Sequence, residues 1–166
     1  MAHNIRCLIG TESEIISVIQ HLRLPRKAIV NLPQNFDLVF LDETAMEAVK
    51  KNWDNEQHIE NSWGLTQGIL DFMQFICREK IAYIETEYFG GTGTQCAALV
   101  EKGKLFVFFF EPDSPYTVED SDLGSYPEKL FNCPINRVLR YSGIERETGR
   151  DEFDTLHLAD YRTMDN

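Results

Sequence analysis

Apolar residues recur every three or four positions in three segments of the first 80 residues, which is the spacing of one face of an α-helix. The first helix is expected over residues 11–24, where Thr11 and Glu14 form a capping-box pattern. In that pattern Thr11 caps the helix and the Glu14 side chain reaches back to the same end. Asp42 is the expected cap of the second helix and Ser62 that of the third.

Strands are expected where β-branched and aromatic residues gather between turn signals. The last three expected strands follow one another through short turns, so they form an antiparallel meander over about residues 80–110. Residues 105–110 are apolar on both faces, which predicts a strand at the centre of its sheet. The expected strands cover residues 3–9, 28–32, 36–41, 81–89, 94–101 and 105–110.

The last third of the chain has a different character. Residues 111–133 hold three prolines and six acidic residues against one lysine, which predicts a long loop that is either flexible or binds a partner. A helix is expected from Pro134 to a stop at Gly143, and apolar residues after position 151 are expected to anchor the tail on the body. The whole pattern predicts a single α+β domain over residues 1–166, with a mainly antiparallel sheet packed with three to four helices.

The cysteines and the N-terminal sequence indicate the cellular compartment in which the protein is expected. The four cysteines lie far apart, and no two have the CxxC spacing of a metal site. They are expected to be free thiols in a reducing cytoplasm, although one disulfide pair is also compatible with them. The N-terminus lacks the pattern of a signal peptide, and no apolar run is long enough to span a membrane. No metal-binding, cofactor-binding or complete catalytic motif occurs, so we expect no metal and no cofactor.

The chain is strongly acidic, with a formal net charge of −11. Nucleic acid is therefore not an expected partner, because phosphate contacts need a basic face. Residues 1–110 carry 14 acidic and 10 basic side chains, whereas residues 111–166 carry 13 and 6. The acidic end is either a solvated face or a surface for a basic protein partner. The expected partner surface comprises Glu111, Asp113, Glu119, Asp120 and Asp122.

A glycine-rich corner joins two of the expected strands. It leads from strand to strand and no lysine follows it, which favours a sharp hairpin turn over a nucleotide-binding loop. Glu85 and Glu87 precede the corner and share one strand face, about 7 Å apart. Gln95 follows the corner and is expected to face the same surface. The candidate ligand site comprises Glu85, Glu87, Gly90, Gly91, Thr92, Gly93 and Gln95.

Three segments carry a resemblance to a known group. The stretch IETEYFGGTGTQCAA at residues 84–98, the helix start PINRVL at 134–139 and the tail motif DEFD at 151–154 resemble a group of small uncharacterised bacterial proteins. That group shares an EYFGGxGxQxA stretch and a DEFD-like tail, and the resemblance covers roughly residues 80–162. It implies no catalytic residue. In size and acidity the chain is also similar to immunity proteins encoded beside polymorphic toxins, which implies a basic partner.

These observations leave three functions open. The first is a non-enzymatic acidic binding protein, of the inhibitor or immunity type, for a basic protein partner; the missing catalytic motif favours it. The second is a small enzyme or ligand-binding domain with its site at the Gly90–Gly93 corner, which requires a pocket lined by the neighbouring carboxylates. The third is a subunit of a homo-oligomer that associates through the edge or the aromatic surface of the meander.

Overall fold

The computed structural model describes residues 2–60, 62–89, 92–110 and 133–161, with the backbone alone at residues 2, 3, 88, 89, 92 and 93. In chain order the elements are β1 (Ala2–Thr11), α1 (Glu12–Leu22), η1 (Arg26–Ala28), β2 (Ile29–Asn31), η2 (Pro33–Asn35), β3 (Phe36–Phe40), α2 (Glu43–Lys50), α3 (Gln67–Ile76), β4 (Lys80–Phe89), β5 (Thr92–Glu101), β6 (Lys104–Phe110), α5 (Pro134–Ser142), α6 (Glu152–Thr155) and η5 (Leu158–Tyr161).

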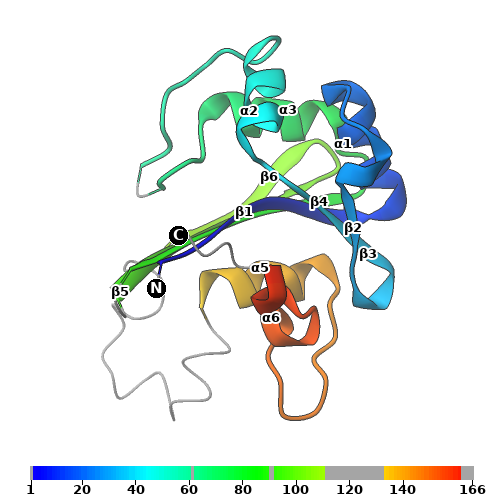
Figure 1. Ribbon diagram of the computed structural model, residues 1–166, viewed down its shortest axis with the longest axis vertical. Helices are drawn as coiled ribbons and strands as arrows, with labels where there is room; N and C mark the ends of the chain where they lie inside the picture. Colours follow the sequence, from blue (N-terminus) through cyan, green and yellow to red (C-terminus); the bar gives the residue numbers. More distant parts are fainter. Residues whose placement is uncertain (1, 61, 90–91, 111–132, 162–166) are drawn as a thin grey trace.

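The six strands form one antiparallel sheet in the order β2-β3-β1-β4-β5-β6. Helices α1, α2 and α3 cover one face, and α5 and α6 cover the other (Figure 1). The predicted α+β class, the single sheet and the meander of β4, β5 and β6 are therefore confirmed. The described residues contain five α-helices instead of the expected three to four, because the DEFD tail motif forms the short helix α6.

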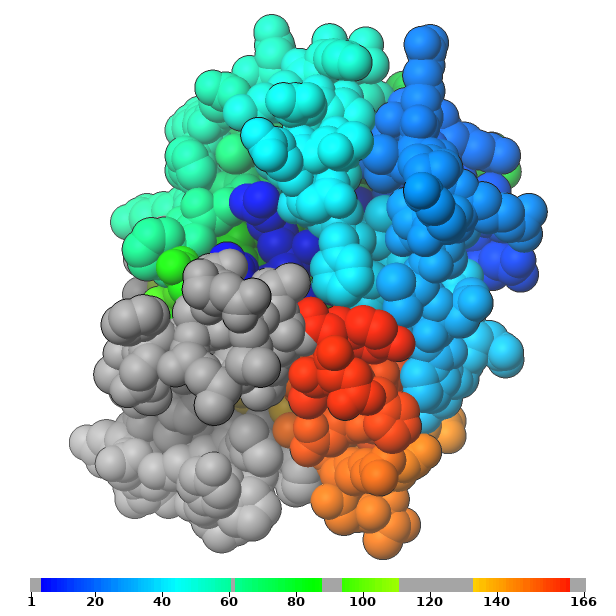
Figure 2. Space-filling model, in the orientation of Figure 1, coloured from blue at the N-terminus to red at the C-terminus, as the bar shows by residue number. Residues whose placement is uncertain are grey.

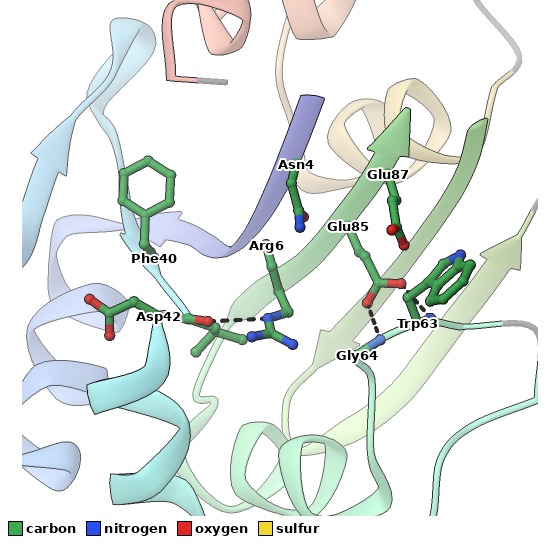
Figure 3. Close-up of a pocket in the computed structure, with 9 residues that line it drawn as sticks. Asn4, Arg6, Phe40, Asp42, Trp63, Gly64, Glu85 and Glu87 are labelled. Carbon is green, nitrogen blue, oxygen red and sulfur yellow. Dashed lines mark hydrogen bonds between the residues drawn. The ribbon is translucent and has the colours of Figure 1, made fainter. Parts of the chain in front are cut away.

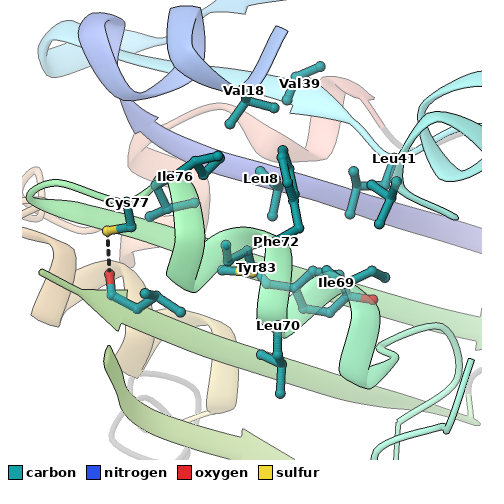
Figure 4. Close-up of a cluster of buried hydrophobic side chains, with 14 of the residues drawn as sticks. Leu8, Val18, Val39, Leu41, Ile69, Leu70, Phe72, Ile76, Cys77 and Tyr83 are labelled. Carbon is teal, nitrogen blue, oxygen red and sulfur yellow. Dashed lines mark hydrogen bonds between the residues drawn. The ribbon is translucent and has the colours of Figure 1, made fainter. Parts of the chain in front are cut away.

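Strand alternation divides the interior into two cores. Along β1, Leu8 packs under the α1–α3 layer, whereas Cys7 and Ile9 pack under α5 and α6. Figure 4 shows the first core, in which Phe72 of α3 lies against Tyr83 of β4. Each fully buried side chain of this size stabilises the fold by about 1.5–3 kcal/mol through removal of apolar surface from water. The sheet is therefore held from both faces, and its strand ends are where polar side chains can gather.

The helix starts differ from two of the sequence predictions. Asp42 caps α2 as expected, accepting a hydrogen bond from Ala45 N at 2.9 Å. Thr11 makes no side-chain cap bond, and the buried Glu14 carboxylate accepts from the backbone of a distant segment instead of reaching back. Thr66 rather than Ser62 caps α3. The two errors have different causes: distant backbone donors occupy the Glu14 carboxylate, whereas the Ser62 hydroxyl donates to the nearby carbonyls of Ile59 and Leu65.

The position predicted for the strand at residues 105–110 is also wrong. This strand, β6, is the edge of the described sheet and pairs with β5 alone among the described strands. Its side chains are apolar on both faces because α5 and α3 each cover part of it, and Leu105 and Phe106 remain exposed. A homo-oligomer formed through this edge stays a prediction. The long loop expected at 111–133 lies outside the described residues except for Cys133.

The C-terminal predictions agree with the structure. Helix α5 begins at Pro134 and ends before Gly143, whose φ of 103° is a conformation that glycine adopts without strain. The tail packs on the body through three buried side chains, Phe153, Leu156 and Leu158.

No helix among the described residues combines the length and the apolarity needed to cross a membrane.

All four cysteines are free and buried. Burial raises the pKa of the Cys7 thiol well above its ordinary value of 9.0. Burial, reinforced by the nearby Glu85 charge, does the same to the pKa of Cys96. The folded protein thus keeps both thiols protonated at a pH where the unfolded chain ionises them.

This difference predicts a loss of stability in alkali. The contribution of each raised thiol pKa is present below pH 9.0 and declines as the pH rises toward the folded-state value. Between pH 9 and 10 each thiol should lower the free energy of unfolding by about 1 kcal/mol. Urea unfolding across this range measures the decline. Its slope should be smaller in a Cys7→Ala variant, and an unchanged slope would contradict the assignment.

Candidate functional site

The site begins at the pairing of β1 with β4. The antiparallel register sets Arg6 opposite Glu85 and Asn4 opposite Glu87. These four positions lie on the same sheet face as Leu8 and continue that face beyond the end of the apolar core. Residues that lie 79 and 83 positions apart in sequence (Arg6 with Glu85, Asn4 with Glu87) therefore bring a guanidinium, an amide and two carboxylates to one patch.

A loop between α2 and α3 closes over this patch and is fastened to Glu85. The Glu85 carboxylate, only 3% exposed, accepts hydrogen bonds from Trp63 N at 2.6 Å and Gly64 N at 2.8 Å. The Tyr83 hydroxyl donates a third bond to the same carboxylate. Ser62 folds the loop by donating from its hydroxyl to the carbonyls of Ile59 and Leu65. Glu85 is thus the anchor that fixes the position of Trp63.

Residue 64 must be glycine for the loop to come this close. A Cβ atom there would lie 3.0 Å from Arg6 Cδ and 3.2 Å from Glu85 Oε2, and closer still to the Arg6 guanidinium. Arg6 has little freedom to move away, because its Nε donates to Leu41 O at 3.1 Å. The loop, the arginine and the anchoring carboxylate therefore pack as one unit.

The unit lines an open cavity of about 460 Å³. In Figure 3, Arg6 lies on its floor, with Glu85 and Glu87 on one side and Asp42 on the other. Figure 2 shows the same region as a hollow in which β1 (dark blue) is visible between the segments around it. The remaining walls come from Asn4, Phe40, Leu41, Trp63 and Gly64.

The cavity has an acidic and partly aromatic lining. Its described lining residues include three carboxylates (Asp42, Glu85 and Glu87) and one guanidinium, that of Arg6, which gives a formal net charge of −2. Trp63 is 62% exposed, so its ring is open to an incoming group. The Glu87 side chain makes no hydrogen bond or ion pair with any residue that the structure describes. A positive charge would therefore meet an uncompensated carboxylate beside an aromatic ring.

Burial also shifts the pKa values of two groups beneath the cavity, Tyr83 and Cys96. It raises the pKa of Tyr83 well above the ordinary value of 10.0, and the adjacent Glu85 charge raises it further. Tyr83 therefore remains a protonated donor to Glu85 throughout the physiological range. Cys96 pairs with Glu85 in the β4–β5 register, and its raised pKa leaves it an uncharged thiol rather than a nucleophile.

The structure brings together only part of the predicted ligand site. Glu85 and Glu87 share one face, as expected, and both line the cavity. Gln95 lies on the opposite face, because Thr94 pairs with Glu87 and Gln95 pairs with Thr86. Thr92 and Gly93 belong to β5, where the structure describes their backbone alone, and Gly90 and Gly91 lie outside the described residues. The predicted partner surface, Glu111, Asp113, Glu119, Asp120 and Asp122, also lies outside them.

Sequence reasoning missed the residues on the other walls. Asn4 and Arg6 interrupt the apolar alternation of β1 on the face that carries Leu8, and this was the available signal. Trp63 and Gly64 lie in a polar loop. A tryptophan between polar or small neighbours in such a loop is a candidate binding residue, and this was a second available signal. Their meeting with Glu85 depends on the β1–β4 pairing, which no local pattern reveals.

No protein-family model, curated protein or solved structure matches this chain. The resemblances to small bacterial proteins and to immunity proteins therefore stay predictions. Within the described part of the chain, no group of three or more His, Cys, Asp or Glu side chains is placed to hold a metal ion.

Proposed function

We propose that this chain is a non-enzymatic binding protein of the inhibitor or immunity type, and that its cavity receives a lysine or arginine side chain of a basic protein partner. The observation that carries the proposal is Glu87, a carboxylate without a partner among the described residues, facing a cavity of net charge −2. Cations are attracted both to this charge and to the face of an indole ring such as that of Trp63.

The bonding of Glu85 favours binding over catalysis. A general acid or base must be free to exchange a proton with a substrate. Both Glu85 oxygens already accept hydrogen bonds, from Trp63 N, Gly64 N and the Tyr83 hydroxyl. Glu85 therefore acts as a structural anchor. The third carboxylate of the cavity, Asp42, caps α2 by accepting from Ala45 N, so neither acid is a free partner for Glu87 in an acid–base pair.

The charge of the whole chain supports a basic macromolecular partner. A net charge of −11 attracts a basic protein over distances of about 10 Å at moderate ionic strength and speeds its association. The cavity is open and about 460 Å³ in volume, enough for one long side chain presented from a surface. The carboxylates then supply orientation and specificity rather than most of the affinity.

The test uses N-acetyl-arginine amide as the probe and Trp63 as the reporter. A Trp53→Phe background removes the other tryptophan and keeps an aromatic ring against Phe72. We expect saturable quenching of Trp63 fluorescence, weakened by salt. Replacing Glu87 with glutamine should raise the Kd roughly fivefold, because it deletes one charge near the bound cation.

Two controls make this experiment decisive. Glu12→Gln deletes an exposed carboxylate on α1 that is not among the lining residues of the cavity, and it should leave the Kd within about a factor of two. N-acetyl-glutamine amide, which has no charge, should not quench. The proposal fails if arginine amide does not saturate the signal, or if Glu87→Gln and Glu12→Gln have equal effects.

A further inference from the structure

A second cavity adjoins the first one. It has a volume of about 390 Å³ and shares two lining residues, Phe40 and Asp42, with the cavity of net charge −2. Asp42 caps α2 and Phe40 ends β3, so both are held by regular structure. Both cavities therefore meet where β3 ends and α2 begins.

The chemistry of the second cavity is different. Its walls are largely apolar and include Ala28 of η1, Val30 of β2 and Val39 of β3. Among its described lining residues Lys27 is the only cation, and Asp42 lies on the boundary with the first cavity. The first cavity thus has an acidic and partly aromatic lining, whereas the lining of the second cavity is apolar with one basic residue.

We propose that the two cavities form one groove for an extended segment of the basic partner, with a lysine or arginine in the first cavity and an apolar side chain in the second. This inference rests on the proposed function and names the ligand more closely. In an extended segment, side chains two residues apart point to the same side, about 7 Å from one another. The recognised pattern is therefore basic-x-apolar.

The groove discriminates against a uniformly basic segment. A second lysine or arginine in the apolar cavity would lose hydration and approach the Lys27 ammonium, whereas a leucine would remove apolar surface from water. General attraction to a chain of charge −11 makes the opposite prediction, since it favours the ligand with more positive charges. The two explanations can therefore be separated by experiment.

Three synthetic peptides provide that experiment, each blocked at both ends: Gly-Arg-Gly-Leu-Gly, Gly-Arg-Gly-Gly-Gly and Gly-Arg-Gly-Arg-Gly. We measure their Kd values by Trp63 fluorescence in the Trp53→Phe background at moderate salt. The leucine peptide should bind roughly tenfold tighter than the glycine peptide, from burial of one leucine side chain. It should also bind tighter than the peptide with two arginines.

A blocking variant tests the location. Thr44 is exposed on α2 and lines the second cavity but not the first, so Thr44→Phe should remove the advantage of leucine and leave binding of the glycine peptide unchanged. Gln20→Phe, on an exposed position of α1 that lines neither cavity, is the matched control and should retain the advantage.

The outcomes separate the two proposals. Tightest binding of the leucine peptide, lost in Thr44→Phe, supports the groove. Equal affinities, or tightest binding of the peptide with two arginines, overturn the groove and leave the cation-binding cavity standing. If none of the peptides binds, the proposed function fails together with the groove.

Discussion

Replacing Glu85 with alanine is expected to lower the free energy of unfolding by about 3–5 kcal/mol. The variant would leave the donors Trp63 N, Gly64 N and the Tyr83 hydroxyl without their acceptor, and Gly64 N and Tyr83 are buried. Each buried donor that loses its partner costs about 1–3 kcal/mol, more when the lost acceptor is charged. Urea unfolding at pH 7 measures the loss.

Two variants separate anchoring from charge. Glu85→Gln keeps one oxygen, which can serve Gly64 N and Tyr83 but not Trp63 N, so its cost should be intermediate, about 1–2 kcal/mol. Glu87→Ala removes a carboxylate from the same strand face that has no partner among the described residues, and its cost should be within about 0.5 kcal/mol. Equal costs for Glu85→Ala and Glu87→Ala would show that Glu85 does not hold the loop.

The same anchor connects stability with binding. The indole of Trp63 can contribute to cation binding only if its loop is held over β1 and β4, and three hydrogen bonds to Glu85 hold it there. Because the loop that carries Trp63 is already fixed, binding of a ligand does not have to pay the entropic cost of ordering that loop. One buried acid therefore stabilises the fold and prepares the cavity, while the neighbouring acid, Glu87, faces the ligand.

Local patterns predicted most of the fold. Helical spacing identified α1, α2 and α3, and the run of β-branched and aromatic residues identified all six strands. The position of β6 could not be predicted in this way, because an all-apolar run says that both faces are covered and not whether a strand lies beyond it. The helix α6 was too short to show a period in the sequence.

The candidate site was predicted on one strand and missed on its neighbours. Alternation sufficed to place Glu85 and Glu87 on a common face, but the face of Gln95 depended on the number of residues between the strands. Phe89 pairs with Thr92, which leaves two residues between them, whereas three would have set Gln95 opposite Glu87. Arg6 could not be placed beside Glu85 without the β1–β4 register, which is set by packing of the whole sheet.

Replacing Glu14 with alanine should lower the free energy of unfolding by about 2–4 kcal/mol, which is more than a helix cap provides. Glu14 is 3% exposed, and its Oε1 accepts from Glu79 N at 2.6 Å and from Arg78 N at 3.1 Å. These donors lie where the chain leaves α3 and enters β4, so the carboxylate joins the start of α1 to the start of a central strand.

Matched variants distinguish this tertiary role of Glu14 from capping. Glu12→Ala, an exposed acidic position in the same first turn, should cost less than about 0.5 kcal/mol by urea unfolding. Glu14→Gln retains an oxygen for both backbone donors and should cost only about 1–2 kcal/mol. A small cost for Glu14→Ala, equal to that of Glu12→Ala, would restore the capping-box interpretation. A large cost for Glu14→Ala would mean that Glu14 holds β4 in place, and with it Glu85 and Glu87, through a hydrogen bond from Arg78 N, which is 64 residues away in sequence.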